Sequence, residues 1–271
     1  MGNLKTFVGI VALFSSLNSQ ASLLMGGSPL EDTKVAESLY APMAEILGEA
    51  LGIDVSVDYS RDWQYFSKEI LNSSYDILLT EPHIIAYVTS YESQLSMSAL
   101  ARLPGQVQHH VVVNQDNTAD SLASLNTARI CMLPSPNFSG VMIKKEFTNP
   151  VSQPVVREVK GSYSNVYEKF KQGRCDAAVI DDINFQRLKT AGEAIKSVYQ
   201  TQASPNLGLA INQRVAPADR ELIIEALQDP AVIEKLAGIF NKYSSGQGPF
   251  EEASNADYEP FDILPGVVWG W

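Results

Sequence analysis

Short apolar runs alternate with longer stretches of helical periodicity, which is the pattern of parallel β-strands connected by α-helices. In the first part of the chain the predicted strands cover residues 22–26, 53–59, 75–79 and 94–101, and the predicted helices cover 33–51, 61–72 and a stretch from residue 84. A strongly β-branched strand at 107–114 then leaves this group of elements. The first part of the chain therefore predicts one α/β lobe.

The same alternation restarts near residue 128. Strands are predicted at 129–133, 155–159, 175–180 and 195–199, and helices at 141–147, 163–172 and 183–190. A strand at 207–212 brings the chain back, and helices follow at 217–228 and 230–243, before a tail without clear periodicity. Two α/β lobes joined by two crossings place a ligand cleft between the carboxyl ends of their strands.

The segment after the strand at 129–133 has the composition of a tight loop that opens a helix. Pro134 and Pro136 end the strand, and Asn137 and Ser139 are candidate helix N-caps. A strand, a tight loop and a helix point free backbone N–H groups at whatever lies over the start of the helix. This loop is a candidate ligand contact, with an ordinary strand-to-helix turn as the alternative.

Residues 1–21 differ from the rest of the chain. Lys5 precedes an apolar run at 7–14, and Ser19-Gln20-Ala21 supplies small residues for cleavage, as in a secretory signal peptide. The apolar run is too short to span a bilayer. We therefore expect export to the periplasm.

Composition narrows the functional classes. The 271 residues are 45% hydrophobic, enough for a substantial core, and the formal net charge of −11 argues against a nucleic-acid partner.

Cys131 and Cys175 are the only cysteines, and an exported protein can oxidise them. Because neighbouring parallel strands rarely give good disulfide geometry, two buried thiols are the expectation and a disulfide the alternative. His109 and His110 point to opposite faces of one strand, so we expect no metal site and no cofactor.

Four stretches resemble one family in chain order. They are Y-D-I-L-L-T-E-P-H-I-I-A-Y (75–87), V-V-V-N-Q-D-N (111–117), P-S-P-N-F-S-G (134–140) and the segment 163–182, which contains G-R-C-D-A-A-V-I-D-D. Together they resemble the PhnD-like periplasmic binding proteins of phosphate, phosphite and phosphonate ABC importers. This resemblance implies a type II periplasmic-binding-protein fold, with two doubly wound α/β domains joined by two crossover strands.

The resemblance also implies a domain division and partners. Lobe 1 is expected at 22–110 plus 205–271 and lobe 2 at 111–204, after a signal peptide at 1–21. The protein is expected to be a monomer that presents a small-molecule ligand to an inner-membrane ABC permease. A membrane sensor kinase is the alternative partner. A periplasmic hydrolase is a third reading, for which Ser139-Gly140 and a distant His83 are the candidates.

The residues in the family's ligand positions depart from its pattern. The family's D-P-x-S-T-S-G loop cradles a phosphonate with hydroxyls and amides, whereas only Ser139 keeps a hydroxyl here, and Tyr163 stands where the family has a histidine. The predicted ligand-binding residues are Trp63, Glu81, His83, His109, Asn137, Phe138, Ser139, Tyr163 and Asp181. Trp63 and Phe138 have a core alternative, and Glu81 and Asp181 have the alternative of helix-start acids.

This set of side chains leaves two ligand classes open. Aromatic faces with carboxylates suit an organic cation or zwitterion, through cation–π attraction and charge pairing. Burying Glu81 or Asp181 against a phosphonate would cost free energy unless the acid were protonated. The sequence therefore predicts either a phosphonate-like ligand or, by its aromatic and acidic cleft, a small organic compound.

Overall fold

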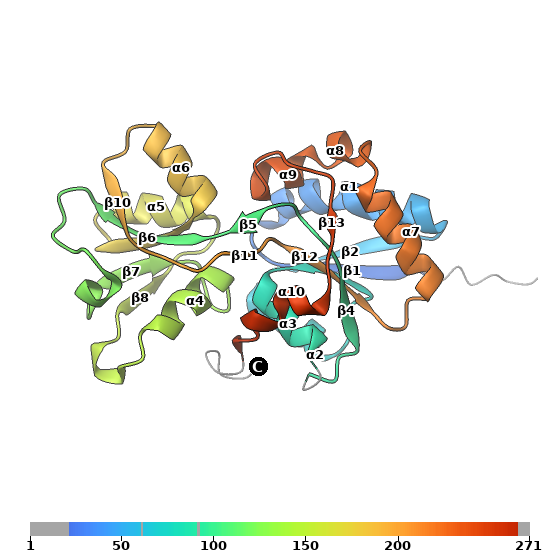
Figure 1. Ribbon diagram of the computed structural model, residues 1–271, viewed down its shortest axis with the longest axis horizontal. Helices are drawn as coiled ribbons and strands as arrows, with labels where there is room; N and C mark the ends of the chain where they lie inside the picture. Colours follow the sequence, from blue (N-terminus) through green and yellow to red (C-terminus); the bar gives the residue numbers. More distant parts are fainter. Residues whose placement is uncertain (1–21, 61, 91–92, 265–271) are drawn as a thin grey trace, which may run out of the picture.

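A computed structural model describes residues 22–264, apart from residues 61 and 91–92. The predicted signal peptide at 1–21 lies outside the described residues. Two lobes lie side by side, each with its own β-sheet, and extended segments run between them (Figure 1). Within the described part of the chain, no helix is long and apolar enough to cross a membrane.

The first lobe is built on a six-stranded sheet in the order β13-β4-β12-β3-β1-β2. Its strands are β1 (Leu23–Gly27), β2 (Val55–Tyr59), β3 (Ile77–Thr80), β4 (Met97–Arg102), β12 (Gly208–Asn212) and β13 (Glu251–Glu252). β1 pairs in parallel with β2 and β3, whereas β12 is antiparallel to both β3 and β4. The tail adds β13 at the edge, antiparallel to β4. A returning strand thus lies at the centre of the sheet.

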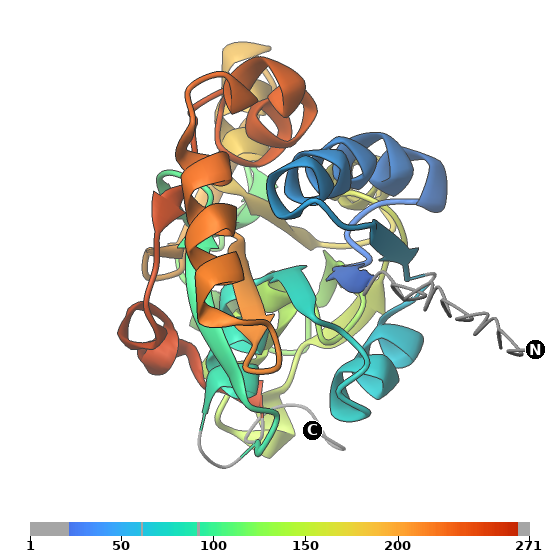
Figure 2. The same ribbon diagram turned by 90° about the vertical axis from the view of Figure 1, so that its right-hand side faces the viewer.

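Helices cover both faces of this sheet (Figure 2). One face carries α1 (Thr33–Leu51), α7 (Pro217–Gln228), α8 (Val232–Lys235) and α9 (Ala237–Tyr243). The other carries α2 (Trp63–Leu71), α3 (Pro82–Thr89), α10 (Asn255–Tyr258) and the short helix η3 (Glu259–Phe261). Ile77 and Leu79 pack into the first layer and Leu78 into the second, because successive side chains of a strand point to opposite faces.

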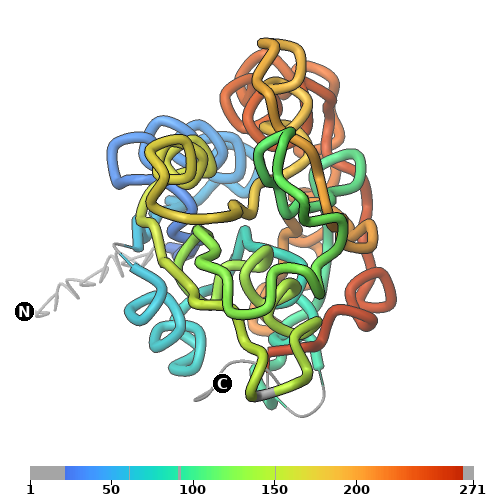
Figure 3. Tube along the Cα trace, turned by 90° about the vertical axis from the view of Figure 1, so that its left-hand side faces the viewer, coloured from blue at the N-terminus to red at the C-terminus, as the bar shows by residue number. Residues whose placement is uncertain are grey.

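The second lobe has a five-stranded sheet in the order β10-β6-β9-β7-β8. Its strands are β6 (His109–Asn114), β7 (Arg129–Met132), β8 (Val155–Glu158), β9 (Ala177–Asp181) and β10 (Ile195–Gln200). Its helices are α4 (Phe138–Glu146), α5 (Tyr163–Lys171) and α6 (Asp182–Thr190), with the short helices η1 (Leu122–Leu125) and η2 (Pro150–Ser152). α4 packs on one face, and α5 with α6 on the other (Figure 3).

Two antiparallel segments join the lobes. β5 (Gln106–Val107) pairs with β11 (Ser204–Pro205), and the two strands form a small sheet of their own. The single strand expected at 107–114 is therefore divided at Gln108, whose side-chain amide donates to the Thr201 carbonyl 3.1 Å away. The prediction of two α/β lobes joined by two crossover strands is confirmed.

The lobes also touch directly, away from the crossover strands. Phe138, Val141 and Met142 of α4 belong to the same buried apolar cluster as Ile84 of α3 and Phe261 of the tail. This contact brings the beginning of α4 against the beginning of α3. Buried apolar side chains are therefore shared between the lobes.

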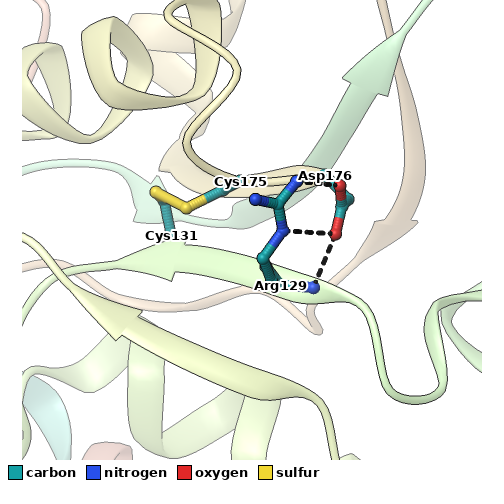
Figure 4. Close-up of a disulfide and its surroundings, with 4 residues drawn as sticks. All are labelled: Arg129, Cys131, Cys175 and Asp176. Atoms are coloured by element: carbon teal, nitrogen blue, oxygen red, sulfur yellow. Dashed lines mark hydrogen bonds and ion pairs between the residues drawn. A yellow bond between two sulfur atoms is a disulfide. The ribbon is translucent and has the colours of Figure 1, made fainter.

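The cysteines form a disulfide, so the expectation of two buried thiols is wrong. The Cα atoms of Cys131 and Cys175 are 5.6 Å apart (Figure 4). Cys131 lies in β7, but its register partner in β9 is Ala178. Cys175 therefore precedes the paired part of β9, where the chain can bend toward β7. Asp176 holds this bend by a 2.7 Å ion pair with Arg129 and by accepting the Arg129 backbone N–H (Figure 4).

Candidate functional site

A cleft of about 540 Å³ lies between the lobes. Its walls come from the starts of α3, α4, α5 and α6, from the crossover segment β5, and from the end of α9. Among the predicted site residues, those that line the cleft are Glu81, His109, Phe138, Tyr163 and Asp181. Three more, His83, Asn137 and Ser139, are fully buried in the layer behind this lining.

Trp63 lies elsewhere, in the core of the first lobe. It is 8% exposed and packs edge-on against Phe66, with ring centroids 5.9 Å apart. Trp63, Phe66 and Ile70 follow helical spacing, so they form the apolar face that attaches α2 to its sheet. Trp63 is therefore a core residue of the first lobe, which was the alternative to its predicted contact with a ligand.

The loop before α4 uses its polar groups within the protein. The Asn137 side-chain oxygen accepts the Ser139 backbone N–H at 3.2 Å and the Ser139 hydroxyl at 2.6 Å. Glu81 Oε1 accepts from Asn137 Nδ2 at 2.9 Å and from the Phe138 backbone N–H at 3.1 Å. Glu81 belongs to the first lobe and the loop to the second, so this network crosses between the lobes.

The two buried histidines of the site are neutral. Burial lowers the pKa of His83 to about 3, and its Nε2–H donates to the Pro136 carbonyl at 2.6 Å. Burial likewise lowers the pKa of His109 to about 3, with smaller contributions from His110 and His83. Because Ser139 donates to Asn137 and His83 to Pro136, the two hydrolase candidates do not form a nucleophile–base pair.

Two atoms of the cleft lining lack a hydrogen-bond partner among the described residues. They are Glu81 Oε2 and His109 Nδ1, and both are buried. Burial raises the pKa of Glu81 to about 8, and the hydrogen bond from the Phe138 backbone opposes this shift. Buried polar atoms are normally satisfied, so two orphans in one cleft indicate a place for a ligand's polar group.

Asp181 and Tyr163 form the wall on the second lobe. Asp181 caps α6 by accepting the Asn184 backbone N–H at 2.8 Å and its side-chain amide at 2.6 Å. Burial raises the pKa of Asp181, and the Asn184 hydrogen bonds oppose that shift. Burial also raises the pKa of Tyr163 well above its ordinary value, so the phenol is neutral, and its ring lies 5.9 Å from the His109 ring.

The sequence matches, over residues 25–258, the family described as ABC transporter, phosphonate, periplasmic substrate-binding protein. The chain belongs to this phosphonate-binding family. The family consists of substrate-binding transport proteins, not enzymes; its members are periplasmic, bind small ligands and work with ABC permeases. No curated protein sequence matches the chain.

Solved structures with the same fold are distant in sequence. XAC2383 from Xanthomonas citri, bound to ATP, has a TM-score of 0.73 at 12% identity and covers 91% of this chain and 99% of its own. PhnD1 from Prochlorococcus marinus, in complex with methylphosphonate, has a TM-score of 0.70 at 11% identity, covering 91% and 98%. A phosphonate transporter component from Pseudomonas aeruginosa has a TM-score of 0.65 at 13% identity, covering 89% and 84%. The type II periplasmic-binding-protein fold is thus confirmed.

In this member of the phosphonate-binding family, sequence reasoning missed part of the lining. Glu31 forms an ion pair with Lys242, with the two charged groups 2.8 Å apart, and both residues line the cleft. Arg187 of α6 lines the opposite wall. Lys242 lies near the end of α9, and no local pattern shows that this helix end reaches the cleft. Arg187 stands one helical turn beyond Ile183, a spacing that does mark a shared face with the start of α6.

His110 faces away from the cleft, because it follows His109 in β6 and successive side chains of a strand point to opposite faces. Its ring stacks on Phe185 at 4.3 Å, Nε2 lies 3.0 Å from Asp182 Oδ1, and Nδ1 lies 3.0 Å from the Ser197 hydroxyl. Among the described residues, no cluster of three or more His, Cys, Asp or Glu side chains could hold a metal ion.

The buried Glu81 carboxyl predicts a pH dependence of stability. Its pKa is about 8 in the folded protein against 4.5 as the ordinary value, so the folded state holds a proton that the unfolded state has released. Stability is therefore lost as the pH rises through 8. Between pH 6.5 and 8 the contribution of Glu81 to the free energy of unfolding should fall by about 1.5 kcal/mol. The Glu81→Gln variant should lack this fall.

Urea unfolding of both proteins at several pH values measures this difference. His83 and His109, whose pKa values are lowered in both proteins, contribute equally to the two pH curves, so the difference between the curves isolates Glu81. Parallel pH curves for the wild type and the Gln variant would contradict the prediction.

Proposed function

We propose that this member of the phosphonate-binding family captures a small organic solute with a cationic amino group in the interlobe cleft. The protein then presents the solute to an inner-membrane ABC permease. The observation that carries the proposal is the pairing of a buried acid, Glu81, and a half-buried acid, Asp181, with the aromatic ring of Tyr163 in one cleft lining. A cleft volume of about 540 Å³ fits a small molecule.

The charge of the cleft lining favours a cation. Its acids are Glu31, Glu81, Asp181 and Asp182, and its strong bases are Arg187 and Lys242. Lys242 is already neutralised by Glu31, so the remaining lining is acidic. An ammonium group at Glu81 would donate to the unpartnered Oε2 and favour the ionised carboxylate, which lowers the raised pKa of this acid. Binding of such a solute should therefore release protons when the pH lies below 8.

Tyr163 supports the same ligand class. Its ring stands at the start of α5 among the lining residues, beside His109. The negative face of a tyrosine ring attracts an ammonium or guanidinium group within roughly 6 Å. The neutral His109 ring offers Nδ1 as an acceptor to a ligand N–H, in the tautomer that carries its proton on Nε2.

The permease is the partner that the family supports. Members serve ABC transporters, and no feature of the described residues favours the sensor-kinase alternative. We also propose that the protein is a periplasmic monomer. Its first lobe comprises residues 22–110 plus 205–271, and its second lobe comprises residues 111–204. Delivery of the solute would require the lobes to separate at the crossover strands.

A thermal-shift panel tests the ligand class. Amino acids, quaternary amines, methylphosphonate and phosphite are each added to the protein, and we expect only amine-bearing compounds to stabilise it. At 100 times the dissociation constant, ligand binding adds about 2.7 kcal/mol, or roughly 5–10 °C in Tm for a chain of this size. Asp181→Asn should abolish the shift, whereas Asp116→Asn, on the exposed turn after β6, should retain it.

Two outcomes would count against different parts of the proposal. A larger shift with methylphosphonate than with any amine would contradict the ligand class and leave the solute-binding role intact. Stabilisation by none of these compound classes would count against solute binding itself.

A further inference from the structure

A side chain of the first lobe occupies the start of a helix in the second. Glu81 Oε1 accepts from the Phe138 backbone N–H at 3.1 Å and from Asn137 Nδ2 at 2.9 Å, at the N-terminus of the nine-residue helix α4. Free N–H groups at a helix start are suited to an anion oxygen. The donors that a ligand oxyanion would use there are therefore already engaged by the protein.

The Glu81 side chain does not cap the helix that Glu81 precedes. It stands at the N-cap position of α3, but its side chain makes no capping hydrogen bond to that helix. The side chain instead reaches the other lobe, where it is 4% exposed and its Oε2 has no partner among the described residues. Burying a carboxyl group with one unsatisfied oxygen is unfavourable. Its position is therefore maintained by the surrounding contacts, not by its own solvation.

Those contacts join the same two helix starts. His83, two residues after Glu81, donates from Nε2 to the Pro136 carbonyl at 2.6 Å. The Phe138 ring, 2% exposed, lies 5.2 Å from the His83 ring and 5.9 Å from the Phe261 ring of the first lobe. Hydrogen bonds and apolar packing thus hold α3 against α4.

We propose that Glu81 is a built-in occupant of the anion position at the start of α4, which joins the lobes in place of a ligand oxyanion and excludes phosphonate and phosphate from that position. This inference rests on the proposed function, because it divides one cleft into an occupied part and a free part. The solute takes the free part, lined by Tyr163, Asp181 and the open side of Glu81. Specificity against phosphonates then comes from one side chain.

Calorimetric titration of three proteins with methylphosphonate, and separately with inorganic phosphate, tests the proposal. Glu81→Ala vacates the position, whereas Glu81→Gln cannot ionise and keeps a carbonyl oxygen that accepts the same two N–H groups. We expect Glu81→Ala to bind methylphosphonate at least about tenfold more tightly than the wild type or Glu81→Gln, since one regained hydrogen bond to a charged group is worth that factor. Phosphate, tested alongside, shows whether the vacated position prefers the organic or the inorganic oxyanion.

Each other outcome would overturn the proposal. Equal binding by the wild type and Glu81→Ala would mean that Glu81 does not block the donors. Equal gains in the Ala and Gln variants would assign the exclusion to charge and not to occupancy. The thermal-shift panel of amines on the wild-type protein tests the proposed function separately, because it uses none of these variants.

Amide hydrogen exchange gives a second measurement that needs no ligand. The Phe138 amide should be protected in the wild type and in Glu81→Gln, and should exchange at least about tenfold faster in Glu81→Ala. Should the Ala variant fail to fold, Glu81→Asp serves instead, because its carboxylate is one methylene too short to reach the amide. Unchanged Phe138 exchange in a folded variant of either kind would overturn the proposal.

Discussion

Replacing Phe138 by alanine should lower the free energy of unfolding by about 3–5 kcal/mol, the range for a large buried aromatic side chain. The Phe138 ring is 2% exposed and belongs to the apolar cluster that both lobes share. Its ring centroid lies 5.6 Å from that of His109 and 5.9 Å from that of Phe261. The substitution therefore removes packing within a lobe and between lobes together. Urea unfolding followed by circular dichroism measures the loss.

A second readout separates the interlobe role from ordinary core packing. Phe147→Ala is the matched control, because Phe147 is also buried but packs only within the second lobe. Both variants should lose stability, but only Phe138→Ala should increase the radius of gyration in X-ray scattering. If the two variants have the same radius as the wild type, the contact between α3 and α4 does not hold the lobes together.

Periodicity predicts the helices well where one face is buried throughout. The helix expected at 33–51 is α1 with the same bounds, because Ala36, Leu39, Tyr40, Met43 and Leu47 repeat at helical spacing and are all buried. Flanking residues supply the boundaries: Asp32 caps the first turn, and Gly52 adopts the left-handed conformation after the last. The local pattern of buried positions and caps therefore predicts this helix even though Pro42 lies inside it.

The same reasoning fails where the chain passes from one lobe to the other. The run at 107–114 looks like one strand, because β-branched and apolar residues follow one another without a turn signal. The structure divides it into β5 and β6, since the two parts pair with different strands, β11 and β9. Which partner a residue takes is a long-range property, so the pattern of side chains could not show it.

The candidate site was predictable in its position but not in its internal contacts. Glu81 directly follows β3 and Asp181 is the last residue of β9, and the carboxyl ends of such parallel strands face the cleft. The hydrogen bonds from Asn137 and Phe138 to Glu81 join residues 56 and 57 positions apart. Trp63 was predicted to contact the ligand but lies in the core. An aromatic side chain on an amphipathic helix suits a core and a cleft equally well. Only the packing of α2 decides between them.

Reducing the disulfide should cost the protein roughly 4 kcal/mol of stability, because the bond closes a segment with a sequence separation of 44 residues in the unfolded chain. This segment includes β7, α4, β8 and α5, so it contains the loop that contacts Glu81. Urea unfolding with and without dithiothreitol measures the effect on the wild type. The variant with both Cys131→Ser and Cys175→Ser should unfold like the reduced wild type and should not respond to dithiothreitol. If reductant leaves the wild-type midpoint unchanged, the prediction is wrong and closing this segment in the unfolded chain adds no stability.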